Sequence, residues 1–93
     1  MSSQLPVKLE KVSKEHLDRE ILRVAVMAEL DAINLYEQLA DTAEGEELKK
    51  VLLDVAKEEK THVGEFLALL LEKDKEQAEE LEKGKEEVKE ILE

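Results

Sequence analysis

The chain has 93 residues, of which 42% are charged, and its 25 acidic residues against 14 basic ones give a formal net charge of −11. This length allows one domain, residues 1–93, and the acidic balance argues against a surface for phosphate groups, so no nucleic acid partner is expected. The absence of cysteine excludes disulfides and thiolate metal sites, and a hairpin this small buries little of its surface. Stability must therefore come from helix packing between chains.

The two ends of the sequence and its apolar runs bear on localisation. The longest apolar run, residues 66–71, is far too short to cross a bilayer, and the first ten residues lack the apolar core of a signal peptide. We therefore expect a cytoplasmic protein that does not bind membranes. Residues 1–12 include Pro6 and no sustained periodicity, which predicts an extended N-terminal arm.

Two long helices are predicted next. Ser13 is a suitable N-cap, and no helix breaker follows until about Ala43, with apolar residues recurring at helical spacing over a wide face. Gly45 is expected to end this helix, and a second helix is expected over residues 46–71. Because the connection is short, the two helices should lie antiparallel. A face this wide suggests burial against more than one neighbour.

A shorter third helix is predicted at the C-terminus. Asp74 is placed to cap it, and Gln77 stands at the capping-box position. Residues 75–93 then read as a polar helix with a thin apolar stripe, interrupted at Gly84. The fold class expected is all-α: two long antiparallel helices plus this shorter C-terminal helix.

Three polar residues break the apolar faces of the long helices. At about 100° per residue, Glu29 projects into the middle of the apolar stripe of the first helix, and Glu59 and His62 share the apolar stripe of the second. A buried carboxylate normally needs a partner or neutralisation. Two carboxylates and an imidazole facing one interior are explained by a bound divalent cation, with iron, manganese and zinc the fitting metals.

Other polar residues near these positions are read differently. Glu-x-x-His is a weak motif by itself in so charged a chain, and Glu58 and Lys60 fit a solvated face. His16 lies near a helix start among polar neighbours and is interpreted as a surface residue without a role. Tyr36 follows Glu29 by two turns on the same face. Its hydroxyl either hydrogen-bonds a ligand carboxylate, or Tyr36 is an ordinary core tyrosine whose hydroxyl finds another partner.

The ligand set in one chain is half of a known arrangement. Ferritin-like di-iron proteins take a Glu from each of two helices and Glu-x-x-His from each of two others. One copy supplies Glu29 on one helix and Glu59 with His62 on the other, so two copies complete a four-helix bundle and its site. We therefore expect a homodimer holding one di-iron centre. There Fe(II) is oxidised to Fe(III) by oxygen or peroxide, the two Glu59 side chains bridge the metals, and His62 and Glu29 ligate terminally.

Residues 28–36 (AELDAINLY) and 58–62 (EEKTH) resemble the encapsulated ferritins, two-helix ferritin-like proteins of encapsulin nanocompartments. The similarity extends from about residue 15 to residue 92 and is greatest to ferritin-like domains fused to archaeal encapsulin shells. The resemblance implies ferroxidase ligands at Glu29, Glu59 and His62, with Tyr36 beside them. It also implies metal-site dimers joined into a decameric ring, an encapsulin shell protein as partner, and delivery of oxidised iron for storage inside the compartment.

The chain departs from the family pattern in three ways. Ala28 stands where relatives often carry a Glu. Asp31 and Leu35 stand where some relatives have the Glu and Trp of an outer site through which iron enters, so Asp31 alone is a candidate there. The terminal residues lack the apolar tag by which cargo docks, which leaves three expectations: a domain of a shell fusion, another docking route, or a free protein.

Two other functions fit the same residues. One is a non-catalytic divalent-metal-binding or scaffold domain whose site holds zinc or stays empty. The other is a plain helical oligomerisation module, for which Glu29→Ala should leave stability unchanged or raise it. Peroxide reduction of the rubrerythrin kind is disfavoured, because there are no cysteines to build a rubredoxin-type electron donor.

Overall fold

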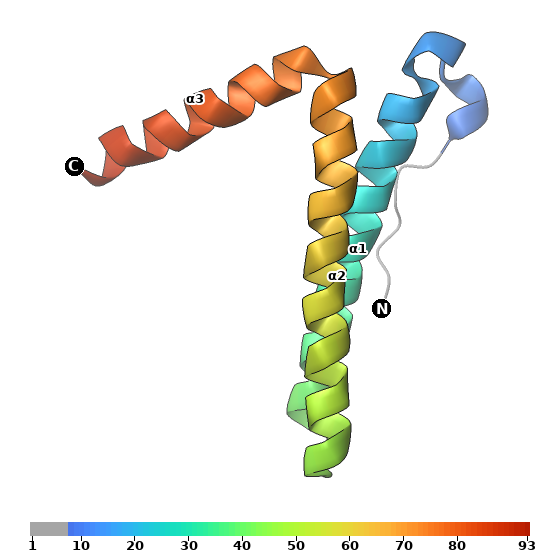
Figure 1. The fold of residues 1–93 in the computed structure, drawn as a ribbon, viewed down its shortest axis with the longest axis vertical. Coiled ribbons are helices and arrows are strands. Elements are labelled where there is room, and N and C mark those ends of the chain that lie inside the picture. The colour runs from blue at the N-terminus through green and yellow to red at the C-terminus, as the bar shows by residue number, and fades with distance from the viewer. Residues whose placement is uncertain (1–7) are drawn as a thin grey trace.

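A computed structural model describes residues 8–93 of the chain. Three α-helices follow one another: α1 spans Leu17–Thr42, α2 spans Glu46–Lys73 and α3 spans Lys75–Leu92. The helices α1 and α2 lie side by side as an antiparallel hairpin, and α3 turns away from the hairpin at a steep angle where α2 ends (Figure 1). The all-α fold and its three helices are as predicted from the sequence.

The N-terminal segment differs from the prediction. Of the expected arm at 1–12, residues 1–7 lie outside the described residues, while Leu9–Lys11 form a 3₁₀ turn, η1, rather than extended chain. Ser13 precedes a second 3₁₀ turn, η2, at Lys14–His16, so the cap predicted for α1 belongs to this turn. Short 3₁₀ turns are common at helix starts because they satisfy backbone groups within one turn.

The glycines also differ from the prediction. Gly45 does not end α1 in a left-handed conformation; it is the extended N-cap residue of α2, and its carbonyl accepts the Lys49 N–H at 3.0 Å. The chain leaves α1 through extended Ala43, so no left-handed residue is needed. Gly84 does not interrupt α3, which continues unbroken through it.

Asp74 forms the elbow between α2 and α3. Its Oδ1 accepts the Gln77 N–H at 3.0 Å, which confirms the predicted cap, and its Oδ2 accepts from Arg23 Nη2 on α1 at 2.7 Å. Arg23 also donates to Glu20 Oε2 at 3.1 Å. The Gln77 N–H, followed by the Arg23 guanidinium, lowers the pKa of Asp74 against the opposing effect of burial. The Asp74 side chain thus ties the start of α3 to α1.

The hydrophobic core of one chain is thin. Within residues 8–93, five hydrophobic residues are buried, all on α1 and α2: Leu22, Ile33, Ala40, Ala56 and Leu70. In the same described part of the chain, eleven large hydrophobic residues are exposed, spread over all three helices. None of the helices in this part of the chain is both long and apolar enough to span a membrane. The exposed apolar surface is what the sequence predicts for a chain that packs against further copies.

Candidate metal centre

The three predicted ligands come together in the structure. Glu29 lies near the middle of α1, and Glu59 and His62 occupy successive turns of the facing α2. One ligand atom from each residue falls within 4.8 Å of the others, and His62 Nδ1 lies 3.5 Å from an Oε2 of each carboxylate. The antiparallel pairing of α1 and α2 therefore converts two helical patterns into one cluster.

The carboxylates of this cluster are withdrawn from water. The Glu29 and Glu59 side chains are each 19% exposed, against 41% for His62. Glu29 Oε2 is buried and has no hydrogen-bond partner. A buried carboxylate oxygen that makes no hydrogen bond carries a desolvation cost that a bound cation would remove. Two carboxylates and an imidazole are ligands suited to iron, manganese or zinc, so the residues fit such an ion.

The charged residues next to the cluster on α2 face solvent instead of the cluster. Glu58 and Lys60 are exposed, as predicted for a solvated face. Lys60 Nζ pairs with Glu37 Oε2 of α1 at 3.1 Å, outside the cluster. An exposed pair of this kind adds little stability. The pair keeps the Lys60 ammonium away from Glu29 and Glu59, so this lysine does not neutralise the cluster and a bound cation can do so.

The remaining candidates lie outside the cluster. Among the described residues, only Glu29, Glu59 and His62 form a group with metal-ligand geometry, so Asp31 is not brought into it. Tyr36 is half-buried on α1, and across residues 8–93 no hydrogen bond joins its hydroxyl to Glu29. His16 is 45% exposed and contacts Glu15, as expected for a surface histidine.

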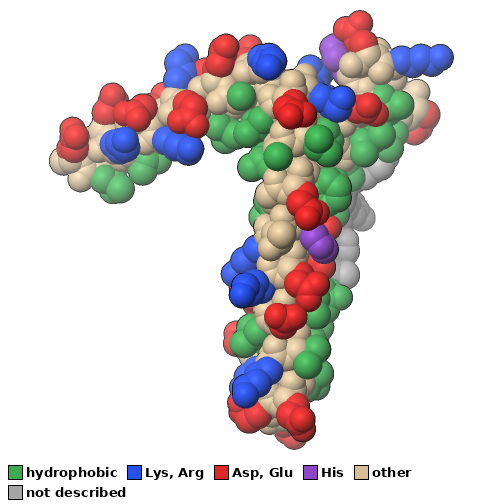
Figure 2. All heavy atoms as spheres, in the orientation of Figure 1, with side chains coloured by type: hydrophobic (Ala, Val, Ile, Leu, Met, Phe, Trp, Pro, Cys, Tyr) green, Lys and Arg blue, Asp and Glu red, His purple; other side chains and the backbone are tan. Residues whose placement is uncertain are grey.

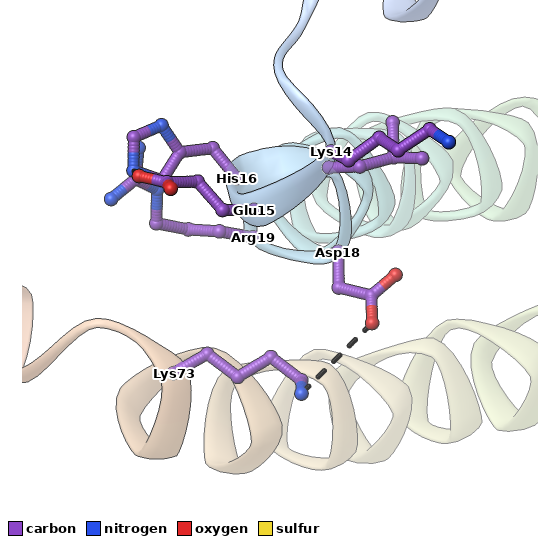
Figure 3. Close-up of a pocket in the computed structure, with 7 residues that line it drawn as sticks. Lys14, Glu15, His16, Asp18, Arg19 and Lys73 are labelled. Atoms are coloured by element: carbon purple, nitrogen blue, oxygen red, sulfur yellow. Dashed lines mark ion pairs between the residues drawn. The ribbon is translucent and has the colours of Figure 1, made fainter.

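A pocket beside the start of α1 offers no comparable constellation. Its cationic side chains do not converge (Figure 3): His16 and Arg19 lie on one side and Lys14 on the other. Lys73 is paired with Asp18 at 4.0 Å. The pocket therefore lacks a common focus for a ligand, and the cluster midway along the hairpin is the stronger candidate.

The cluster lies on an accessible face of the hairpin. Figure 2 shows a histidine beside carboxylates midway along the hairpin, with hydrophobic side chains above and below it. Three ligand groups do not fill the coordination shells of two metals. The exposed edge of His62 and the flanking apolar surface mark this face as one that a second helical pair can cover.

Comparison with known proteins places the chain in a family. A family model described as EncFtn-like matches residues 4–92. The chain is 65% identical over 79 residues to the ferritin-like-encapsulin shell fusion protein of Pyrococcus furiosus, covering 85% of this chain and 23% of that protein. It is 41% identical over 68 residues to the encapsulin nanocompartment cargo protein EncC of Myxococcus xanthus, covering 73% and 52%.

A solved structure agrees with these sequence relatives. The crystal structure of the encapsulated ferritin domain from Pyrococcus furiosus matches with a TM-score of 0.83 and 56% identity, covering 96% of this chain and 93% of that one. The chain spans less than a quarter of the shell fusion protein and about half of the cargo protein. By sequence and by structure, the chain belongs to the EncFtn-like family, the encapsulated ferritins.

Proposed function

We propose that two copies of the chain join their Glu29–Glu59–His62 faces to form a ferroxidase that converts Fe(II) to Fe(III). The observation that carries this proposal is the buried Oε2 of Glu29, which makes no hydrogen bond and lies 3.5 Å from His62 Nδ1 in a cluster of two carboxylates and an imidazole. A plain oligomerisation interface gains nothing from burying such a group. A bound cation compensates the cost of burying this oxygen.

The number of ligands supports a site shared between chains. Ferritin-like centres use four carboxylates and two imidazoles from four helices. A twofold pair of hairpins supplies that set from Glu29, Glu59 and His62 of each copy. The dimer thereby completes the four-helix bundle, covers the exposed face of the hairpin and provides ligands for two iron ions.

Each side chain has a defined task at this site. Glu29 and Glu59 bind iron through carboxylate oxygens, and His62 binds through a neutral ring nitrogen. Tyr36 makes no hydrogen bond to Glu29 within one chain, so its proposed task is to orient a ligand carboxylate through its hydroxyl once two copies pair, and Asp31 attracts Fe(II) from outside. The bound iron pair supplies the redox chemistry, one electron from each ion to oxygen or peroxide. The net charge of −11 raises the local concentration of cations.

The names of the relatives suggest where in the cell the chain works. One is fused to an encapsulin shell and another is an encapsulin nanocompartment cargo protein. We propose that this chain likewise works with an encapsulin shell protein, inside a cytoplasmic nanocompartment. Metal-site dimers join there into a larger ring, a decamer by resemblance, and oxidised iron passes to the interior for storage.

The test compares two neighbouring glutamates. Fe(II) is added anaerobically to metal-free protein and oxygen follows, with native mass and near-ultraviolet absorbance recorded. Two irons per dimer and fast oxidation are expected for the wild type. Glu59→Ala should lose the fast phase, whereas Glu58→Ala, which removes an exposed carboxylate one position away, should keep it. Oxidation no faster than in buffer would refute the ferroxidase and leave a zinc-loaded or empty scaffold.

A further inference from the structure

The junction between α2 and α3 is a single residue. Helix α2 ends at Lys73 and α3 begins at Lys75, so only Asp74, with φ −131° and ψ 86°, lies between them. Figure 1 shows α3 turning away directly where α2 ends, without a loop. Residues 71–79 (LEKDKEQAE) contain neither glycine nor proline, the residues that commonly mark a helix end. The local sequence therefore favours one continuous helix, and the bend needs another cause.

The backbone hydrogen bonds on both sides of the junction follow the pattern of an uninterrupted helix. The Asp74 N–H donates to the Leu70 carbonyl at 2.9 Å, and the Ala78 N–H donates to the Asp74 carbonyl at 3.2 Å. Both bonds join residues four apart, as in an α-helix. The N–H groups of residues 75–77 form the first turn of α3, where the helix itself provides no acceptor. A change of backbone angles at one residue would give these groups helical partners and join α2 to α3.

Packing restrains α3 only near its start. Every residue from Glu79 to Glu93 is exposed. Hydrophobic side chains gather in the corner where α3 meets the hairpin (Figure 2), and this corner holds an apolar cavity of about 380 Å³ to which α3 contributes Gln77 and Leu81. A void lacks the contacts that close packing provides, so an unfilled corner restrains the angle of α3 weakly.

The Asp74 carboxylate supplies the restraint that packing does not. Its Oδ1 accepts the Gln77 N–H at 3.0 Å, and so takes the place that the Lys73 carbonyl would have in a continuous helix. Its Oδ2 accepts from Arg23 of α1 at 2.7 Å, and the side chain is 10% exposed. Because both groups are charged, this bond is of the stronger kind. Arg23 thereby holds the carboxylate in the orientation that caps α3.

We propose that Asp74 is a hinge with two positions. With the cap formed, α3 bends away from the hairpin; without it, α2 and α3 join into one straight helix from Glu46 to Leu92. Arg23 selects the bent position by orienting the cap. Two arrangements of one chain that differ little in free energy form a conformational switch. The straight form gains backbone hydrogen bonds, whereas the bent form gains the cap and the contacts of Leu81 in the corner.

The two positions differ greatly in shape. A continuous helix from Glu46 to Leu92 would be about 70 Å long. The longest extent of the bent structure is 46 Å. Straightening would carry the exposed apolar side chains of α3, such as Val88 and Ile91, beyond the end of the hairpin and farther from the metal-binding cluster. The hinge therefore determines which surroundings these side chains meet.

The distance between two spin labels tests the hinge. The chain has no cysteine, so Lys57→Cys and Glu90→Cys place one label at an exposed position of α2 and one at an exposed position of α3. Labelled full-length chains are diluted into unlabelled protein in the presence of a chelator, so that the measured distances lie within one chain. In a straight helix the two positions are about 50 Å apart, and any bend brings them closer. The labelled chain without further changes should show one dominant distance well below 50 Å.

Variants at the junction separate the cap from other effects. Asp74→Ala removes the cap and should move most chains to about 50 Å, with helix content by circular dichroism equal or higher. Asp74→Asn keeps an acceptor oxygen for the Gln77 N–H and should keep the short distance. Arg23→Gln should show both distances. Lys73→Gln removes an exposed ion pair with Asp18 beside the hinge, and should leave the short distance unchanged.

Three results would overturn the proposal. A short distance that persists in Asp74→Ala would mean that packing in the corner sets the angle, and a broad distribution without a component near 50 Å would make α3 a flexible arm. A long distance in Asp74→Asn would remove the role of the cap. If Asp74→Ala loses helix content, Arg23→Gln decides, since the absence of any component near 50 Å contradicts the hinge. The protein is metal-free throughout, so failure here leaves the proposed ferroxidase untouched, and a protein that does not oxidise iron still tests the hinge.

Discussion

Replacing Glu29 with Gln should stabilise the metal-free protein. Ligand oxygens of Glu29 and Glu59 lie within 4.8 Å of one another, and both side chains are 19% exposed. Two like charges at that separation repel by about 3.5 kcal/mol at an effective dielectric constant of about 20, and by about 0.9 kcal/mol in water. Glu29→Gln keeps the shape and removes the charge, so we expect a gain of about 1–3 kcal/mol.

Urea unfolding in the presence of a chelator, at one protein concentration, measures this gain. Glu58→Gln is the matched control, because it removes the same charge from an exposed position one residue from Glu59. Mn(II) at about 1,000 times the Kd should then reverse the order, because the wild type gains about 4.1 kcal/mol and the variant, which lacks one ligand carboxylate, gains much less. A Glu29→Gln protein no more stable than Glu58→Gln would refute the reasoning about buried charge. A wild type indifferent to metal would favour the plain oligomerisation module.

Three further outcomes are expected. Leu70→Ala should lower the free energy of unfolding by about 2–5 kcal/mol in urea, because Leu70 is 5% exposed in a thin core. Because the pKa of Asp74 is lowered, its carboxylate stabilises the fold at pH values above its ordinary pKa of 3.8, and this contribution is lost as the pH falls below 3.8. Circular dichroism between about pH 5 and pH 2 should therefore show a smaller acid transition in Asp74→Asn. Tyr36→Phe should change the stability of the metal-free protein by less than about 0.5 kcal/mol but slow iron oxidation, which stopped-flow absorbance measures.

The clustering of the three proposed ligands could be predicted from the sequence because helical geometry is local. Glu59 and His62 are three residues apart, so any helix brings them to one face. Glu29 breaks the apolar stripe of the other helix, and a polar residue in that position signals a role in the interior. The convergence of the three side chains depends further on the register of α1 against α2, which a short connection restricts to an antiparallel pair.

Other features depend on contacts that no local pattern records. The bond from Arg23 to Asp74 joins residues 51 positions apart, and it requires the particular direction of α3. The choice between a 3₁₀ and an α turn after Ser13 involves small energy differences, so the sequence pattern placed that helix start wrongly. Gly45 matched a common helix terminator, but the extended Ala43 had already ended α1.

The proposed site links cation binding to assembly. Pairing two metal-binding faces gathers four carboxylates that already repel within each chain, and it joins two molecules that each carry a net charge of −11. Without a cation, the apolar surface around the cluster favours pairing while these charges oppose it. A divalent ion bound between the copies turns the same carboxylates into the strongest attraction across the interface. Metal should therefore increase the affinity of the dimer itself, and the increase should vanish when Glu29 is replaced by Gln.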